Sequence, residues 1–340
     1  MRKVILIQIM MCVSMFMLAQ TTEEPNTVLV DGVYYLIWTD KKEAWVSNNE
    51  TDDYRYEGEI TIPEQITYEG KTYPVVAIRW EAFAFSDKLT AVQLPNTIKR
   101  IMSSAFNRCS ALKTINIPES VEEIDDFAFL WCTGLTSITI PASVTKMAST
   151  AFHCCKGFPM ENGLRYADRF LIETDKQQQH YTLKEDTQWI GVNAFSDNPN
   201  LVSIVLPQSV EVIGSFAFSQ CPSLLFAELH RTSITWIGDG AFSSCTTLDM
   251  VTLPKTLKEI PQTVFWGCWN LREIYSLATT APLIVGVSDD NTFRMVDKEK
   301  CQIHVPKGSL FDYKVARGWQ DFKLIDDEAI AKGMLEKKVR

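Results

Sequence analysis

The sequence contains few of the side chains that carry out catalysis, with four histidines among 340 residues. It has no His-Glu-x-x-His zinc motif, no Gly-x-Ser-x-Gly nucleophile motif and no glycine-rich phosphate loop. The cluster His153-Cys154-Cys155 offers at most two outward-facing side chains, and two ligands do not close a metal site. We therefore expect a protein that is not an enzyme and that has no metal or other cofactor.

Long apolar runs are also scarce. The one run long enough to enter a membrane extends from Val4 to Leu18, follows Arg2 and Lys3, and precedes the small residue Ala19. This pattern predicts a secretory signal peptide that is cleaved near Ala19, since no later stretch is long and apolar enough to span a bilayer.

Cations are in the minority, with 33 Lys and Arg against 42 Asp and Glu and a net charge of −9. Cleavage after Ala19 would remove two cations and no acid, which changes the net charge to −11. A negative, diffuse charge disfavours nucleic acid and anionic lipid as partners. We expect a secreted, cell-surface or periplasmic protein with no membrane span and no nucleic-acid partner.

An internal repeat dominates the rest of the chain. An Ala-Phe pair recurs seven times, and Val264-Phe265 is a degenerate eighth copy. The pairs begin at Ala82, Ala105, Ala128, Ala151, Ala194, Ala217 and Ala241, at steps of 23, 23, 23, 43, 23 and 24 residues, with a further 23 to Val264. A period in this range indicates a solenoid, in which each unit stacks on its neighbours and the array presents an extended surface.

Each repeat contains the same series of apolar residues. One unit reads Leu112, Ile115, Ile117-Pro118, Val121, Ile124, Ala128-Phe129 and Cys132. The Ile-x-Ile stretch has period two, which predicts a strand with both aliphatics facing inward, and the following proline ends it. The Ala-Phe pair and the cysteine three residues later predict a short helical or 3₁₀ turn. Stacked units would bury a continuous core with a column of Phe rings.

This unit resembles the BspA-type leucine-rich repeat, with the pattern L-x-x-I-x-I-P-x-S-V-x-x-I-G-x-x-A-F-x-x-C, from about Ile60 to Ile325. The resemblance implies an α/β leucine-rich-repeat solenoid, a right-handed coil with a parallel β ladder, short helical or 3₁₀ turns, and N- and C-terminal caps. It also implies a Bacteroidetes-like surface protein of a host-associated bacterium. Extracellular-matrix and other proteins are the usual partners in such a family.

The expected organisation follows the repeats. It comprises a signal peptide (1–19), an N-terminal β cap (20–59), the leucine-rich repeats (60–275), a C-terminal cap (276–325) and a charged tail (326–340). The 43-residue step contains 20 extra residues, and two strand-like stretches flank a turn within them. We expect residues 157–188 to form one expanded hairpin repeat rather than a linker between domains.

Six cysteines occupy one repeat position, three residues after the Phe. They are Cys109, Cys132, Cys155, Cys221, Cys245 and Cys268. A position inside the packed core favours a ladder of buried thiols that act as small hydrophobes. Disulfides between adjacent coils are the alternative, because export would permit them.

The outward positions of the first predicted strand change character along the chain. Before the long step they are small and polar, and after it they become bulky. We expect a candidate binding strip made of Val205, Phe226, Glu228, Met250, Glu273 and Tyr275. The alternative is that the hairpin of residues 157–188 covers it. A second candidate patch consists of Trp131, Trp266 and Trp269, which can equally pack between turns.

The predicted function is therefore macromolecular recognition or adhesion at the cell surface by an exported, non-enzymatic repeat protein. The expected partner is a protein, either of the host matrix or of a bacterial surface. Two alternatives remain open: a carbohydrate-binding accessory that stacks sugars on Trp and Tyr, and a structural protein of the envelope.

Overall fold

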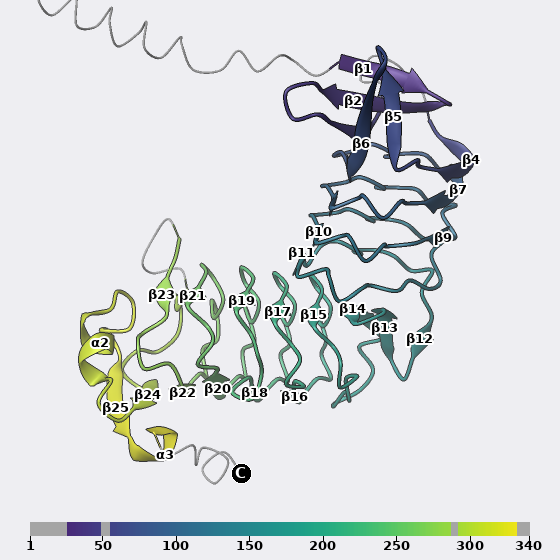
Figure 1. Cartoon of the computed structure of the whole chain (residues 1–340). Helices are drawn as coiled ribbons and strands as arrows, with labels where there is room; N and C mark the ends of the chain where they lie inside the picture. Colours follow the sequence, from purple (N-terminus) through teal and green to yellow (C-terminus); the bar gives the residue numbers. More distant parts are fainter. Residues whose placement is uncertain (1–25, 49–54, 287–291, 332–340) are drawn as a thin grey trace, which may run out of the picture.

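The computed structural model describes residues 26–48, 55–286 and 292–331. The expected signal peptide (1–19) and the end of the expected charged tail lie outside these residues. Within the described part, no helix is long and apolar enough to cross a membrane. The chain forms a leucine-rich-repeat β-solenoid with parallel ladders and little helix (Figure 1).

The first described strands are antiparallel. Strands β1 (Asn26–Val30), β2 (Val33–Trp38) and β3 (Glu43–Ser47) pair in sequence order, and β5 (Gln65–Tyr68) forms a hairpin with β6 (Lys71–Ile78). Strand β3 also pairs with β6, but in parallel. This small sheet therefore covers the end of the first coil and changes the pairing from antiparallel to the parallel pairing of the repeats.

Most coils contribute a strand to each of two ladders. The first arm of the solenoid has two ladders. One comprises β4 (Glu57–Thr61), β7 (Lys88–Gln93) and β9 (Thr114–Ile115). The other comprises β6, β8 (Arg100–Ile101), β10 (Glu123–Ile124) and β11 (Lys146–Met147). In the second arm one ladder comprises β16 (Ser203–Val205), β18 (Phe226–Glu228), β20 (Met250–Leu253), β22 (Glu273–Ser276), β24 (Gln302–Pro306) and β25 (Lys323–Asp327). The other comprises β15 (Trp189–Ile190), β17 (Val212–Ile213) and β19 (Trp236–Ile237), followed by β21 (Glu259–Ile260) and β23 (Leu283–Ile284).

The Ala-Phe segments form a third side of each coil, built from single turns. Backbone N–H groups alternate between two partners: Ala105 donates to Met102 O within its own coil (3.1 Å), and Phe106 donates to Ala128 O of the next coil (2.7 Å). The predicted helical character is thus limited to isolated i→i+3 bonds, as in a 3₁₀ turn. The assigned helices, α2 (Leu310–Val315) and α3 (Glu328–Ala331), are near the end of the described chain.

The Phe rings form the predicted aromatic spine. Phe106 stacks on Phe129 with centroids 5.2 Å apart and planes 2° from parallel, and Phe129 stacks on Phe152 at 5.0 Å. The second arm continues the same arrangement, with Phe195 and Phe218 at 4.7 Å. These rings are fully buried, so each coil fixes the position of the next through the core.

The expanded coil interrupts both the spine and the ladders. Strands β12 (Met160–Glu161), β13 (Leu164–Ala167) and β14 (Phe170–Thr174) are antiparallel, and β14 then pairs in parallel with β15. Phe152 meets Phe170 at 65° instead of stacking flat, and the buried residues form two large clusters. The two arms consequently meet at an angle, which we call the elbow (Figure 1).

The cysteine ladder is made of buried, free thiols. Each thiol donates to the carbonyl of a Phe in the preceding coil, as from Cys132 Sγ to Phe106 O at 3.1 Å. This confirms the packing interpretation of these positions. Burial raises the pKa of the Cys109 and Cys155 thiols to about 12, so they carry no charge near neutral pH.

Candidate binding surfaces

The predicted strip lies on the outward side of the ladder from β16 to β22, but its residues fall in two columns. Phe226 aligns with Met250 and Glu273, whereas Val205 aligns with Glu228, Thr252 and Tyr275. The apolar members are therefore divided between the columns: Phe226 and Met250 lie in one, and Val205 and Tyr275 lie in the other. The repeat spacing gives this register, because successive members of each column are 23 or 24 residues apart.

Only part of the strip is open to solvent. Val205 is 59% exposed and Phe226 37%, whereas Met250 and Tyr275 are 7% and 5% exposed. The expectation that Met250 and Tyr275 are exposed is therefore wrong. Ile330, in α3, belongs to the same small buried cluster as Met250 and Tyr275. The cover is thus the end of the chain and not the hairpin of residues 157–188.

Of the two acidic residues of the strip, Glu273 has a hydrogen-bond partner beside it. The Tyr275 hydroxyl donates to Glu273, and Glu228 is half-buried on β18. Burial, followed by the neighbouring Glu273 carboxylate, raises the pKa of Tyr275. The covered half of the strip is therefore a packed contact of the protein with itself.

The second predicted patch does not form a single surface. Trp131, Trp266 and Trp269 are all exposed, but Trp131 lies in the first arm and the other two lie in the second. They also occupy three different positions of the turn. Trp131 is two residues after the Phe of its repeat, Trp266 is one residue after the Phe, and Trp269 is one residue after the Cys. The elbow separates them, so they do not act together.

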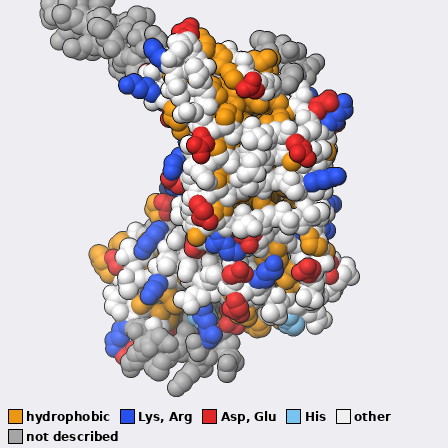
Figure 2. Space-filling model, turned by 45° about the vertical axis from the view of Figure 1, so that its right-hand side comes forward, with side chains coloured by type: hydrophobic (Ala, Val, Ile, Leu, Met, Phe, Trp, Pro, Cys, Tyr) orange, Lys and Arg blue, Asp and Glu red, His pale blue; other side chains and the backbone are white. Residues whose placement is uncertain are grey.

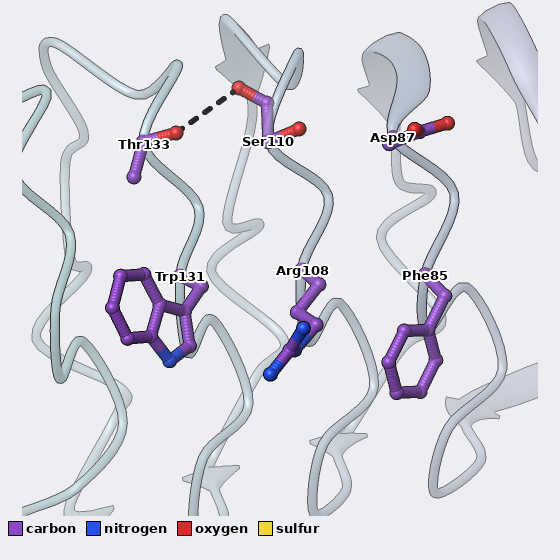
Figure 3. Close-up of a pocket in the computed structure, with 6 residues that line it drawn as sticks. All are labelled: Phe85, Asp87, Arg108, Ser110, Trp131 and Thr133. Atoms are coloured by element: carbon purple, nitrogen blue, oxygen red, sulfur yellow. Dashed lines mark hydrogen bonds between the residues drawn. The ribbon is translucent and has the colours of Figure 1, made fainter.

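The structure instead brings Trp131 together with residues of the two preceding coils. Phe85, Arg108 and Trp131 occupy the same turn position on three successive coils, and their side chains point the same way (Figure 3). We call these three residues the turn row. With the adjacent Asp87, Ser110 and Thr133 they line an open cavity of about 400 Å³.

The turn row combines aromatic rings with a cation. The Arg108 guanidinium lies 5.6 Å from the centroid of the Phe85 ring, within the range of a cation–π contact. Beside the row, the Thr133 hydroxyl donates to Ser110 O at 3.5 Å. All three side chains of the row are exposed. One face of the molecule, drawn in Figure 2, carries interspersed charges of both signs.

The backbone beneath the turn row is in the left-handed region. The φ angles of Phe85, Arg108 and Trp131 are 61°, 62° and 60°. The second arm has the same conformation at the equivalent turn position, occupied there by Asp197, Gln220, Ser244 and Gly267. A left-handed conformation costs an L-residue about 1–2 kcal/mol, and bulky side chains rarely adopt it. The coil therefore requires the conformation but not the bulky side chains.

Of the turn row, only Trp131 was predicted from the sequence as a candidate binding residue. The signal was available, since Phe85, Arg108 and Trp131 are separated by the repeat period of 23 residues. What could not be foreseen is the positive φ, because the repeat pattern was expected to form a helical turn. The structure alone shows that these side chains leave the core and project from the surface.

The His153-Cys154 pair does not form a chemical centre in the described structure. Burial lowers the pKa of His153 and raises the pKa of the Cys154 thiol, so both are neutral at neutral pH. Among the described residues, no group of three or more His, Cys, Asp or Glu side chains is arranged to hold a metal ion.

The fold and its exposed rows define a solenoid of leucine-rich repeats. The repeats match the BspA type leucine rich repeat region over residues 59–160 and 173–283, and the chain belongs to this family. A comparison with curated proteins gives no match.

Several solved structures are similar to the chain. A leucine-rich repeat protein of T. pallidum is 23% identical, with 67% of this chain and 90% of that chain covered and a TM-score of 0.38. A leucine rich cell surface protein of Faecalibacterium prausnitzii is 23% identical, with 92% and 98% covered and a TM-score of 0.39. A leucine-rich repeat protein of Bacteroides ovatus is 19% identical, with 91% and 100% covered and a TM-score of 0.36.

Proposed function

We propose that the protein is an exported, non-enzymatic repeat protein that binds another protein at the cell surface through the turn row. The export part rests on the signal-peptide pattern that ends at Ala19. The binding part rests on the surface that the first arm presents. The partner is a surface protein of a bacterium or a protein of the host matrix.

One observation supports this function above the others: three bulky side chains are kept in a backbone conformation that disfavours them. Phe85, Arg108 and Trp131 have positive φ angles and project into solvent. The coil requires this conformation but accepts Asp, Gln, Ser and Gly in it, so the turn does not account for the bulky side chains. Trp and Arg are also the residue types that contribute most to binding energy at protein interfaces.

The test is a direct comparison of matched variants. The mature chain is used to capture surface proteins, and the captured partner is purified and titrated. We expect the double variant Arg108→Ala, Trp131→Ala to bind at least about tenfold more weakly, which corresponds to ~1.4 kcal/mol or more. The control is Gln220→Ala with Ser244→Ala, at the equivalent positions of the second arm. Equal binding by both double variants would remove the turn row from consideration.

The open half of the strip is a second surface for the same function. Supporting this surface, Ile330 of α3 is buried in one cluster with Met250 and Tyr275, so part of the strip already packs with an apolar side chain of the chain itself. Val205 and Phe226 continue the strip and remain exposed. If the partner uses the strip, Phe226→Ala with Val205→Ala will weaken capture while Arg108→Ala with Trp131→Ala does not.

A further inference from the structure

The elbow contains a cavity of about 420 Å³ that the sequence analysis did not consider. It lies where the ladder of β10 and β11 ends and the ladder of β15, β17 and β19 begins. Residues from both arms line it, which makes it a feature of the bend and not of a single coil. Its volume is within the range of about 300–1,000 Å³ typical of sites for small ligands.

One wall of the elbow cavity is a column of apolar side chains. Trp189, Val212 and Trp236 are in register on the three neighbouring strands β15, β17 and β19. Both Trp residues line the cavity, and Trp189 is buried whereas Trp236 is 44% exposed. A half-exposed indole beside a concave surface offers a flat apolar face to a ligand.

The remaining lining is polar and consists of groups that hydrogen-bond. The acidic side chains already have partners: Arg100 Nε lies 2.8 Å from Glu123 Oε2, and the same guanidinium lies 3.4 Å from Asp125. The Thr150 hydroxyl donates to Asp126 Oδ1 at 2.7 Å.

Glu211, from the second arm, and Lys146 complete this lining. Gln188 Nε2 donates to Glu211 Oε1 at 2.9 Å. Lys146 also lines the cavity and adds a cation to it. The cavity is therefore rich in hydrogen-bond acceptors, and the positive charge of Lys146 offsets part of the negative charge of its carboxylates.

We propose that the elbow cavity binds a segment of an uncharged polysaccharide. A pyranose ring has an apolar face that stacks on Trp236 and a rim of hydroxyl groups. Those hydroxyls donate to the second oxygens of Asp126 and Glu211, and one accepts from Lys146. Each carboxylate oxygen has more than one acceptor site, so the existing bonds leave capacity for a ligand.

A cationic peptide is the competing ligand class, and the lining favours it less. Arg100 is paired with both Glu123 and Asp125, which reduces the negative potential on that wall. The Lys146 amine would repel a second cation in the same cavity. A neutral ligand with many hydroxyls uses both the acids and the amine. This site is separate from the turn row and does not depend on the protein-binding proposal.

The experiment is native affinity electrophoresis in gels that contain hydroxyethylcellulose, mixed-linkage β-glucan or galactomannan. We expect at least one of them to retard the chain, and Trp236→Ala to weaken that binding about tenfold or more. Trp236→Tyr keeps a stacking ring and should retain most of it. Trp80→Ala is the matched control, because Trp80 is 45% exposed and lies outside the cavity. The melting temperature of each variant reports folding.

Three outcomes would overturn the proposal. They are no retardation by any of the three polysaccharides, equal retardation of Trp236→Ala and the unaltered chain, and retention of binding at low salt only. Binding of a hexa-arginine peptide that Trp236→Ala removes, without polysaccharide binding, would assign the cavity to a cationic peptide instead. Arg108→Ala with Trp131→Ala should leave polysaccharide binding unchanged, so failure here and failure of the turn row are distinguishable.

Discussion

The imidazole of His304 stacks on the ring of Tyr275, with centroids 4.2 Å apart and planes 15° from parallel. On its other side, His304 Nδ1 lies 3.1 Å from Asp327 Oδ2, at the residue that directly precedes α3. Ile330, three residues after Asp327, is buried in one cluster with Met250 and Tyr275. The half of the strip that contains Met250 and Tyr275 is therefore covered because β25, which ends at Asp327, is held beside it through His304.

Loss of this attachment should expose Met250. We expect His304→Ala and Ile330→Ala each to increase the rate at which hydrogen peroxide oxidises Met250, because its cover loosens or is removed. Peptide mass spectrometry measures the rate. Met147 is the internal control, since it is equally buried at 7% exposure but lies in the other arm. Unchanged oxidation of Met250 in both variants would contradict the role of α3 as its cover.

The Phe spine should be the most sensitive part of the core. Phe129 is fully buried between Phe106 and Phe152, at 5.2 and 5.0 Å. We expect Phe129→Ala to lower the free energy of unfolding by ~3–5 kcal/mol, since it leaves a cavity between two coils. Urea unfolding measures the change. Phe127→Ala, at an exposed position two residues earlier, should change stability by less than about 1 kcal/mol.

The turn row should limit stability rather than support it. Asn adopts the left-handed region more readily than Trp does, so Trp131→Asn should relieve local strain at φ 60°. We expect the melting temperature of this variant to be equal to or above that of the unaltered chain, while capture of the protein partner falls. Scanning calorimetry and the binding titration provide the two readouts. A clear drop in melting temperature would show that Trp131 is needed for packing instead.

Most of the core was predictable from the sequence because the repeat imposes it. A position such as Phe129 or Cys132 recurs with the same chemistry in each coil, and burial is the common cause. The thiols follow the same logic, since a small apolar group fits beside the Phe column. Repetition therefore converts a weak local signal into a firm assignment.

The surfaces were less predictable because they depend on contacts distant in sequence. Ile330 lies 55 residues after Tyr275, and nothing in the local pattern of either indicates their contact. The elbow cavity is likewise formed by strands on both sides of the expanded coil, and Trp236 belongs to the second ladder, whose outward positions had not been considered. The repeat indicates what is buried, but not how the arms bend.

The buried thiols should make the protein sensitive to alkaline pH. Burial raises the pKa of the Cys155 and Cys268 thiols from 9.0 to about 12 in the folded chain. Above pH 9 the unfolded chain releases protons that the folded chain retains, so the free energy of unfolding falls as pH rises from 9 towards 12 and is unaffected by these groups below pH 9. Each such thiol contributes at most ~1.4 kcal/mol per pH unit in that window.

Urea midpoints at pH 8 and pH 10.5, with a reductant present, measure the fall. Cys268→Ala removes one of these groups and should show a smaller fall than the unaltered chain, whereas an identical fall would mean that the thiols are not its source.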